Sequence, residues 1–144
     1  MKILHVFIGI VFLALMLVPV NQSIAQEAIL TQANAVTQGV TVTQAVVCQD
    51  VVNRMPVSTG KVFPAGTPRL FCFTRVDGAA GETEIIHNWY YKGTLKASVT
   101  LPVRGTPWRT WSSKGLRPEW IGDWMVEVLA KDGTPLESVS FTIK

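Results

Sequence analysis

A serine and a histidine could form a nucleophilic pair in this chain. His87 is the only histidine beyond residue 25, and it could act as a general base for Ser112 or Ser113. Asp77 or Asp123 could then orient the imidazole in a triad. The serines lack the Gly-x-Ser-x-Gly turn that exposes a nucleophile, and such hydroxyls usually pair with neighbouring backbone. We therefore predict no catalysis here and a hydrogen-bonded core or rim position for His87.

Other catalytic chemistries need residue sets that the chain lacks. Glu82 with Glu84, and Glu119 with Asp123, are acid pairs, but a glycosidase must hold its two acids across a cleft that short loops do not build. A zinc site would have one histidine and would need acids or cysteines as the other ligands. Phosphate-binding loops and dinucleotide fingerprints are absent. We predict a protein that is not an enzyme and has no metal or cofactor.

Cys48 and Cys72 are the only two cysteines. An even pair in an exported protein favours a disulfide, since a redox or metal site would need a Cys-x-x-Cys spacing or more ligands. We predict a disulfide between them. The alternative is two buried thiols that never meet.

The N-terminal residues have the features of a secretory signal. Lys2 precedes an apolar run over residues 3–20, and the small residues Ser23 and Ala25 occupy the two positions that a signal peptidase reads. We predict cleavage after Ala25 and a periplasmic or secreted protein with no stable membrane insertion after cleavage. The alternative is an uncleaved anchor, because the run has about the minimum length that spans a bilayer.

Removal of residues 1–25 leaves 119 residues, which suffices for one domain with a core. It removes Lys2 from the 13 basic residues and none of the 10 acidic ones. The remaining charge is close to neutral, and the cations are scattered singly along the sequence. The sequence therefore predicts no binding of nucleic acid.

Residues 26–40 are rich in Gln, Ala and Thr, which predicts a flexible leader before a domain over residues 41–144. A short motif recurs every six residues through this region, at residues 30–33, 36–39 and 42–45. We assign its last copy, residues 42–45, to the first strand. Because six is even, the repeated aliphatic residues share one face of an extended chain.

The rest of the chain has the alternation of β-strands with no helical period. Seven strands are predicted: residues 40–52, 70–77, 84–92, 95–104, 108–113, 124–130 and 138–144. This number and spacing favour an all-β fold, an antiparallel sandwich of immunoglobulin or fibronectin type. Both cysteines precede Trp89, however, whereas antibody domains place them on either side of the core tryptophan.

The aromatic residues are divided between core and surface. A small sandwich needs a few large core side chains, and we assign this role to Trp89, Trp111 and Trp124. Exposed rings beside cations could instead form a platform for sugar rings or an extended peptide. The predicted binding residues are Tyr90, Trp108, Arg109 and Trp120.

Several separated blocks of the sequence resemble one bacterial family. They are Cys48 with residues 53–56 (NRMP), then residues 70–74 (LFCFT), 87–91 (HNWYY), 109–114 (RTWSSK) and 122–124 (GDW). In this order they resemble the bacterial domain of unknown function 2914, from about Val46 to the C-terminus. The resemblance implies an exported or membrane-attached bacterial module with no established activity.

These observations predict an exported, non-catalytic binding module. The expected partner is an envelope protein, contacted through an exposed sheet edge or the aromatic patch. One alternative is a module that binds carbohydrate or peptidoglycan. Another is a small hydrolase that uses Ser112 or Ser113 with His87.

Overall fold

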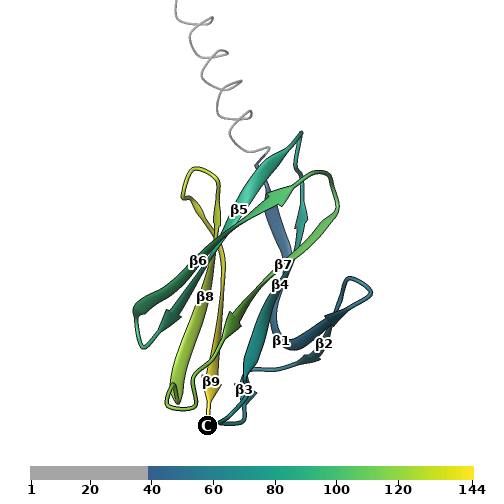
Figure 1. Ribbon diagram of the computed structural model, residues 1–144. Coiled ribbons are helices and arrows are strands. Elements are labelled where there is room, and N and C mark those ends of the chain that lie inside the picture. Colours follow the sequence, from purple (N-terminus) through teal and green to yellow (C-terminus); the bar gives the residue numbers. More distant parts are fainter. Residues whose placement is uncertain (1–38) are drawn as a thin grey trace, which may run out of the picture. The chain divides into compact units, whose positions relative to one another are not determined.

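The computed structural model describes residues 39–144 and shows two β-sheets built from nine strands (Figure 1). The signal peptide and most of the leader predicted for residues 1–40 lie outside the described residues. Within residues 39–144, no helix is long and apolar enough to cross a membrane. The strands are β1 (Thr41–Val52), β2 (Met55–Thr59), β3 (Val62–Phe63), β4 (Arg69–Asp77), β5 (Thr83–Tyr91), β6 (Thr94–Val103), β7 (Trp108–Gly115), β8 (Gly122–Ala130) and β9 (Pro135–Ile143).

The two sheets form the layers of a sandwich. One has the order β2-β1-β4-β7 and the other β3-β9-β8-β5-β6, and every pair is antiparallel except β3 with β9. The all-β sandwich predicted from the sequence is confirmed, with nine strands in place of seven. The two extra strands carry weak signals, since β2 contains Pro56 and a left-handed Ser58 (φ 53°), and β3 has two residues.

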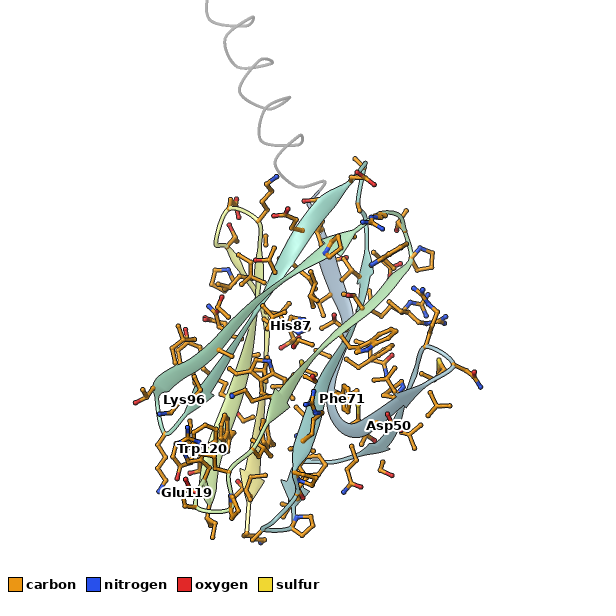
Figure 2. The ribbon with its side chains drawn as sticks, in the orientation of Figure 1. Asp50, Phe71, His87, Lys96, Glu119 and Trp120 are labelled. Carbon is orange, nitrogen blue, oxygen red and sulfur yellow. The ribbon has the colours of Figure 1, made fainter. Side chains whose placement is uncertain are left out.

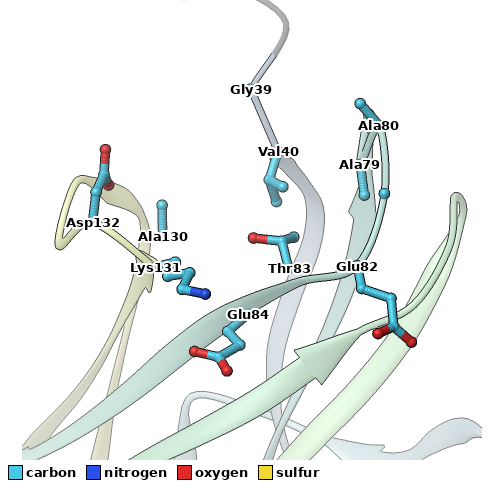
Figure 3. A pocket seen from close by; sticks show the side chains of 12 residues that line it. Gly39, Val40, Ala79, Ala80, Glu82, Thr83, Glu84, Ala130, Lys131 and Asp132 are labelled. Atoms are coloured by element: carbon cyan, nitrogen blue, oxygen red, sulfur yellow. The ribbon is translucent and has the colours of Figure 1, made fainter.

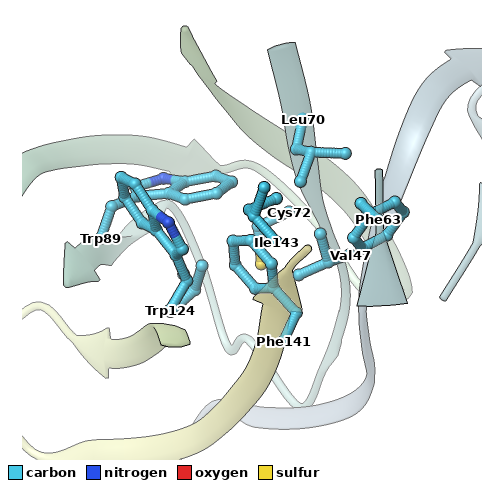
Figure 4. Packing of buried hydrophobic residues seen from close by; sticks show 9 residues of the cluster. Val47, Phe63, Leu70, Cys72, Trp89, Trp124, Phe141 and Ile143 are labelled. Carbon is cyan, nitrogen blue, oxygen red and sulfur yellow. The ribbon is translucent and has the colours of Figure 1, made fainter. Parts of the chain in front are cut away.

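Strand alternation builds the core between the sheets. In β8, Trp124, Val126 and Val128 are buried while the residues between them are more exposed. Trp89 of β5 is fully buried, and its ring lies nearly perpendicular to that of Phe141 of β9 at a centroid distance of 6.2 Å. Figure 4 shows these rings packed together in the larger of two buried clusters. Trp89 and Trp124 therefore occupy the core positions that the sequence predicts.

Trp111 does not share that core. It is half-buried on the outer face of its sheet, where it stacks on Phe73 at 6.4 Å and 14°. The neighbouring residue Ser112 is buried and faces the other sheet. Because successive side chains of a strand point to opposite faces, only one of the two can face inward. The predicted core position of Trp111 is wrong by this one-residue offset.

The predicted disulfide between Cys48 and Cys72 is also wrong, because both thiols are free. Across β1 and β4, Cys72 lies opposite Val47 and Cys48 lies opposite Phe71. The cysteines are thus offset by one residue, which places their side chains on opposite faces of the sheet. Both are fully buried, and burial raises the pKa of the Cys72 thiol to about 12 and also raises that of Cys48.

Thiol labelling should show that Cys48 and Cys72 are free thiols and are not joined in a disulfide. In the folded protein, burial and the raised pKa of Cys72 keep the reactive thiolate scarce, so alkylation by iodoacetamide should be slow. In denaturant without a reductant, both Cys48 and Cys72 should react, and mass spectrometry should count two added labels. A denatured protein that takes up labels only after reduction would contradict this placement of the thiols.

Candidate functional site

A buried polar network joins the two sheets around His87. The His87 Nδ1 atom lies 2.8 Å from the Ser112 hydroxyl oxygen, which also accepts a hydrogen bond from Trp89 Nε1 at 3.0 Å. On the other side of the ring, Nε2 lies 3.4 Å from the hydroxyl of Thr74, which donates to the Thr110 carbonyl at 3.2 Å. The His87 side chain is fully buried, and Ser112 is 4% exposed. The histidine is therefore a hydrogen-bonded core residue.

Burial of the network favours a neutral imidazole. Burial lowers the pKa of His87 to about 4, because the charged form would lose its solvation. In the neutral ring, Nδ1 accepts from the Ser112 hydroxyl and Nε2–H faces Thr74, so every donor points at an acceptor. A protonated Nδ1 would donate to the second lone pair of the Ser112 oxygen, and the Ser112 hydroxyl hydrogen would then need an acceptor other than the imidazole.

The two carboxylates that could orient His87 in a triad form hydrogen bonds with threonines. Asp77 accepts a hydrogen bond from Thr43, and Asp123 accepts one from Thr142, so neither carboxylate contacts the imidazole. Ser112 and His87 are buried side chains of the core network, and no hydrogen bond of the described residues joins a carboxylate to the imidazole.

Surface hollows of the described residues are lined by other side chains. Two of them have volumes of about 600 and 680 Å³, and neither is lined by His87 or Ser112. Figure 3 shows the first, with Val40, Thr83 and Lys131 around its rim. No group of three or more metal-ligating side chains occurs within residues 39–144.

A second cluster lies where the chain passes from β7 to β8. Trp120 packs against Tyr91 and Trp124, with ring centroids 6.1 and 5.6 Å away, and those two rings lie 5.0 Å apart. Backbone carbonyls hold the rings in place, since the Tyr91 hydroxyl donates to Ile121 O at 2.8 Å and Trp124 Nε1 donates to Trp120 O at 3.3 Å. Trp120 is half-buried, so one part of its surface remains open to solvent.

Cations surround these rings. Lys96 of β6, Lys114 of β7 and Arg117 of the following loop lie 5.6, 5.1 and 5.0 Å from the centroid of Trp120. Distances below about 6 Å are typical of cation–π contacts. Figure 2 shows Trp120 and Lys96 together at one end of the strands. A fourth cation, Lys92, lies 5.3 Å from the ring of Tyr91. We call this surface the Trp120 patch, and it consists of Tyr91, Lys92, Lys96, Lys114, Arg117 and Trp120.

The Trp120 patch carries an excess of positive charge. Within the described residues, one of its four cations forms an ion pair. Arg117 lies 4.0 Å from Glu119, and the two side chains are 68% and 65% exposed. Such an exposed contact contributes little stability. The cations are therefore available to an anionic ligand.

The four predicted binding residues do not form one surface. Trp120 lies in the patch, whereas Trp108 and Arg109 lie at the opposite end of β7, where Trp108 is partly buried against the smaller core cluster. Tyr90 lines the second hollow, which Lys92 of the patch also lines, and its hydroxyl donates to Glu127 at 3.3 Å.

Three of the four cations of the patch were missed by sequence reasoning. Lys96, Lys114 and Arg117 come from two strands of different sheets and a loop, and each stands alone among uncharged neighbours or beside one carboxylate. Their separation in the sequence has no regular spacing. The strand termini and loop that bring them together become neighbours only in the folded sandwich.

Residues 82–143 match the model of a family described as "Protein of unknown function (DUF2914)". This confirms the family predicted from the sequence. The match covers β5 to β9, and so contains the Trp120 patch, His87 and Ser112, but it begins well after the Val46 expected from the resemblance. No curated protein matches the chain.

Proposed function

We propose that the chain is an exported, non-catalytic module whose Trp120 patch binds an acidic segment of an envelope protein. The observation that carries the proposal is the gathering of four cations around two packed rings, with one paired carboxylate among them. Export is supported by the apolar run at residues 3–20 and the small residues before Gln26.

The geometry favours carboxylates over sugar rings as the ligand. A sugar stacks on an open ring face, whereas the ring of Trp120 has Tyr91 and Trp124 packed beside it and three cations within 5.6 Å of its centroid. The side chains offered to a partner are therefore the lysine and arginine head groups. Arg117 presents a planar guanidinium that can hold a carboxylate through two hydrogen bonds.

The absence of catalysis is supported by the buried pair. Ser112 is 4% exposed and His87 is fully buried, and no carboxylate contacts the imidazole among the hydrogen bonds of the described residues. A hydrolase would need the hydroxyl to reach a substrate carbonyl and a water molecule.

The proposal can be tested with a labelled peptide, Val-Glu-Thr-Val-Thr-Val-Glu-Thr. We expect the wild-type chain to bind it at low salt, as followed by fluorescence anisotropy. The double variant Lys114→Glu, Arg117→Glu should weaken binding by about tenfold or more, because it replaces two attractions with two repulsions. The single variant Lys131→Glu lies outside the patch and should change affinity by less than about twofold.

Two further measurements decide between the outcomes. The same peptide with Gln in place of Glu should bind much more weakly, since the attraction comes from its carboxylates. Equal affinities for the double variant and the wild type would refute binding through the Trp120 patch. Binding to isolated peptidoglycan that Trp120→Ala abolishes and the charge reversals leave intact would instead support the carbohydrate alternative.

A further inference from the structure

Of the four edge strands in the two sheets, β7 is the one best suited to pair with another chain. Edge strand β2 contains Pro56 and a left-handed Ser58, β3 has two residues, and β6 contains Pro102. Proline lacks the N–H that strand pairing needs, and short or kinked edges resist it. The eight residues of β7 contain no proline. Figure 1 shows β6 and β7 spreading apart from the loop that joins them.

The register of β7 on β4 shows which backbone groups point away from the sheet. Leu116 N donates to Pro68 O at 2.9 Å, so this pair is hydrogen-bonded. Pairing continues without a shift through β7, and hydrogen-bonded pairs recur at every second residue. The backbone groups of Trp111 and Ser113 therefore point outward. They offer two N–H and two C=O groups along the free edge.

A group of arginines stands at the start of this edge. Arg54, at the turn between β1 and β2, donates from Nη2 to the outward carbonyl of Arg109 at 3.0 Å, and its guanidinium lies 5.4 Å from the ring centroid of Trp108. Arg75 lies directly opposite Arg109 on the same face, although like charges in this position repel. The carboxylate nearest to Arg75 is that of Asp77, at 3.7 Å. Among the described residues, the ion pair of these three arginines is the one between Arg75 and Asp77.

The Trp120 patch stands at the other end of the same edge, because it contains Lys114. Arg109 and Lys114 are five residues apart, or about 17 Å along an extended strand. Since five is odd, they face opposite sides of the sheet: Arg109 the outer face, and Lys114 the side of the sandwich interior. Between them, Trp111 lies on the outer face and could pack against a side chain of an added strand.

We propose that β7 takes up an extended segment of the partner as an added strand, with an acidic residue at each end of the pairing. Two acidic residues five apart on the partner would point to opposite faces, as the cations do. One would meet Arg54, Arg75 and Arg109, and the other would meet the Trp120 patch. The outward groups of Trp111 and Ser113 would form the hydrogen bonds between them. This inference rests on the proposed function and adds the mode of binding and the spacing of the acids.

Alternate N-methylation of the peptide used above tests strand addition without altering the protein. One version is methylated at the backbone nitrogens of residues 3 and 5, and the other at those of residues 4 and 6. Only one of the two sets can face β7, because the backbone groups of a strand alternate in direction. We expect one version to lose about tenfold or more in affinity and the other to stay within about twofold of the parent peptide.

A matched pair of protein variants gives an independent test of strand addition to β7. Ser113→Pro removes the outward N–H and the hydroxyl, whereas Ser113→Ala removes the hydroxyl alone. Ser113→Pro should therefore bind the peptide about tenfold more weakly than Ser113→Ala. The methylated peptides decide the question even if the proline variant does not fold.

The outcomes separate this inference from the proposed function. If both methylated peptides bind as the parent does, while Lys114→Glu with Arg117→Glu still weakens binding, strand addition is overturned and the Trp120 patch stands. If the charge reversals have no effect, the proposed function is overturned as well. Loss of affinity confined to one methylated set, together with the effect of the charge reversals, supports both.

Discussion

Replacement of Trp89 by alanine is expected to lower the free energy of unfolding by about 3 to 5 kcal/mol, a large share of the 5 to 15 kcal/mol typical of a domain. The side chain is fully buried and packs against Phe141 with the two rings nearly perpendicular. Its Nε1–H donates to Ser112, so truncation leaves a cavity and also takes a partner from the buried network.

Urea melts followed by circular dichroism would measure this loss, with Trp120→Ala as the control. Trp120 is half-buried and keeps one side in solvent, so its truncation should cost about 1 to 2 kcal/mol. Both variants lose the same side chain, and the difference between them reports burial. Equal midpoint shifts would contradict the distinction between the core ring and the ring of the Trp120 patch.

Stability should also depend on pH through His87. The pKa of His87 is about 4 in the folded protein and about 6.5 for an unburied histidine. Between these two pH values, His87 is therefore mostly protonated in the unfolded chain and mostly neutral in the folded chain. The resulting stabilisation is fully present above pH 6.5 and is lost as the pH falls from 6.5 to 4, by about 3 kcal/mol in total.

Comparison with His87→Gln isolates this contribution, because both proteins carry the same carboxylates. Urea melts at pH 7, 6, 5 and 4.5 should show a steeper loss of stability in the wild type than in the variant. At its largest, the difference between the two slopes of unfolding free energy against pH should approach about 1.4 kcal/mol per pH unit. Parallel curves for the two proteins would contradict a neutral, buried His87.

Local alternation explains why much of the fold could be predicted. Trp124, Val126 and Val128 alternate with polar or longer residues, and they are buried as that pattern requires. The strands over residues 94–103 and 135–143 follow the same rule. Where alternation is absent, prediction failed, as at β2, which has a proline and a left-handed residue, and at the two-residue β3.

The predictions that were wrong for particular residues concerned the register between strands and the face to which each side chain points. Cys48 and Cys72 each lie in strands that the sequence predicts, yet an offset of one residue between β1 and β4 points their thiols to opposite faces. Trp111 was assigned inward, whereas Ser112 holds the inward position and contacts His87. A strand's period of two leaves both parities open, and only packing against the opposite sheet selects one.

The sequence by itself determined seven of the nine strands, the sandwich and the burial of Trp89 and Trp124, because side-chain alternation is a property of each strand alone. Only the tertiary structure decided which side chains meet. Lys96 and Lys114 lie in strands of different sheets, and they converge on Trp120 because the loop after β7 carries that ring to the end of β5 and β8. Such convergence depends on the order and offset of strands far apart in the chain, which are set by packing of the whole core.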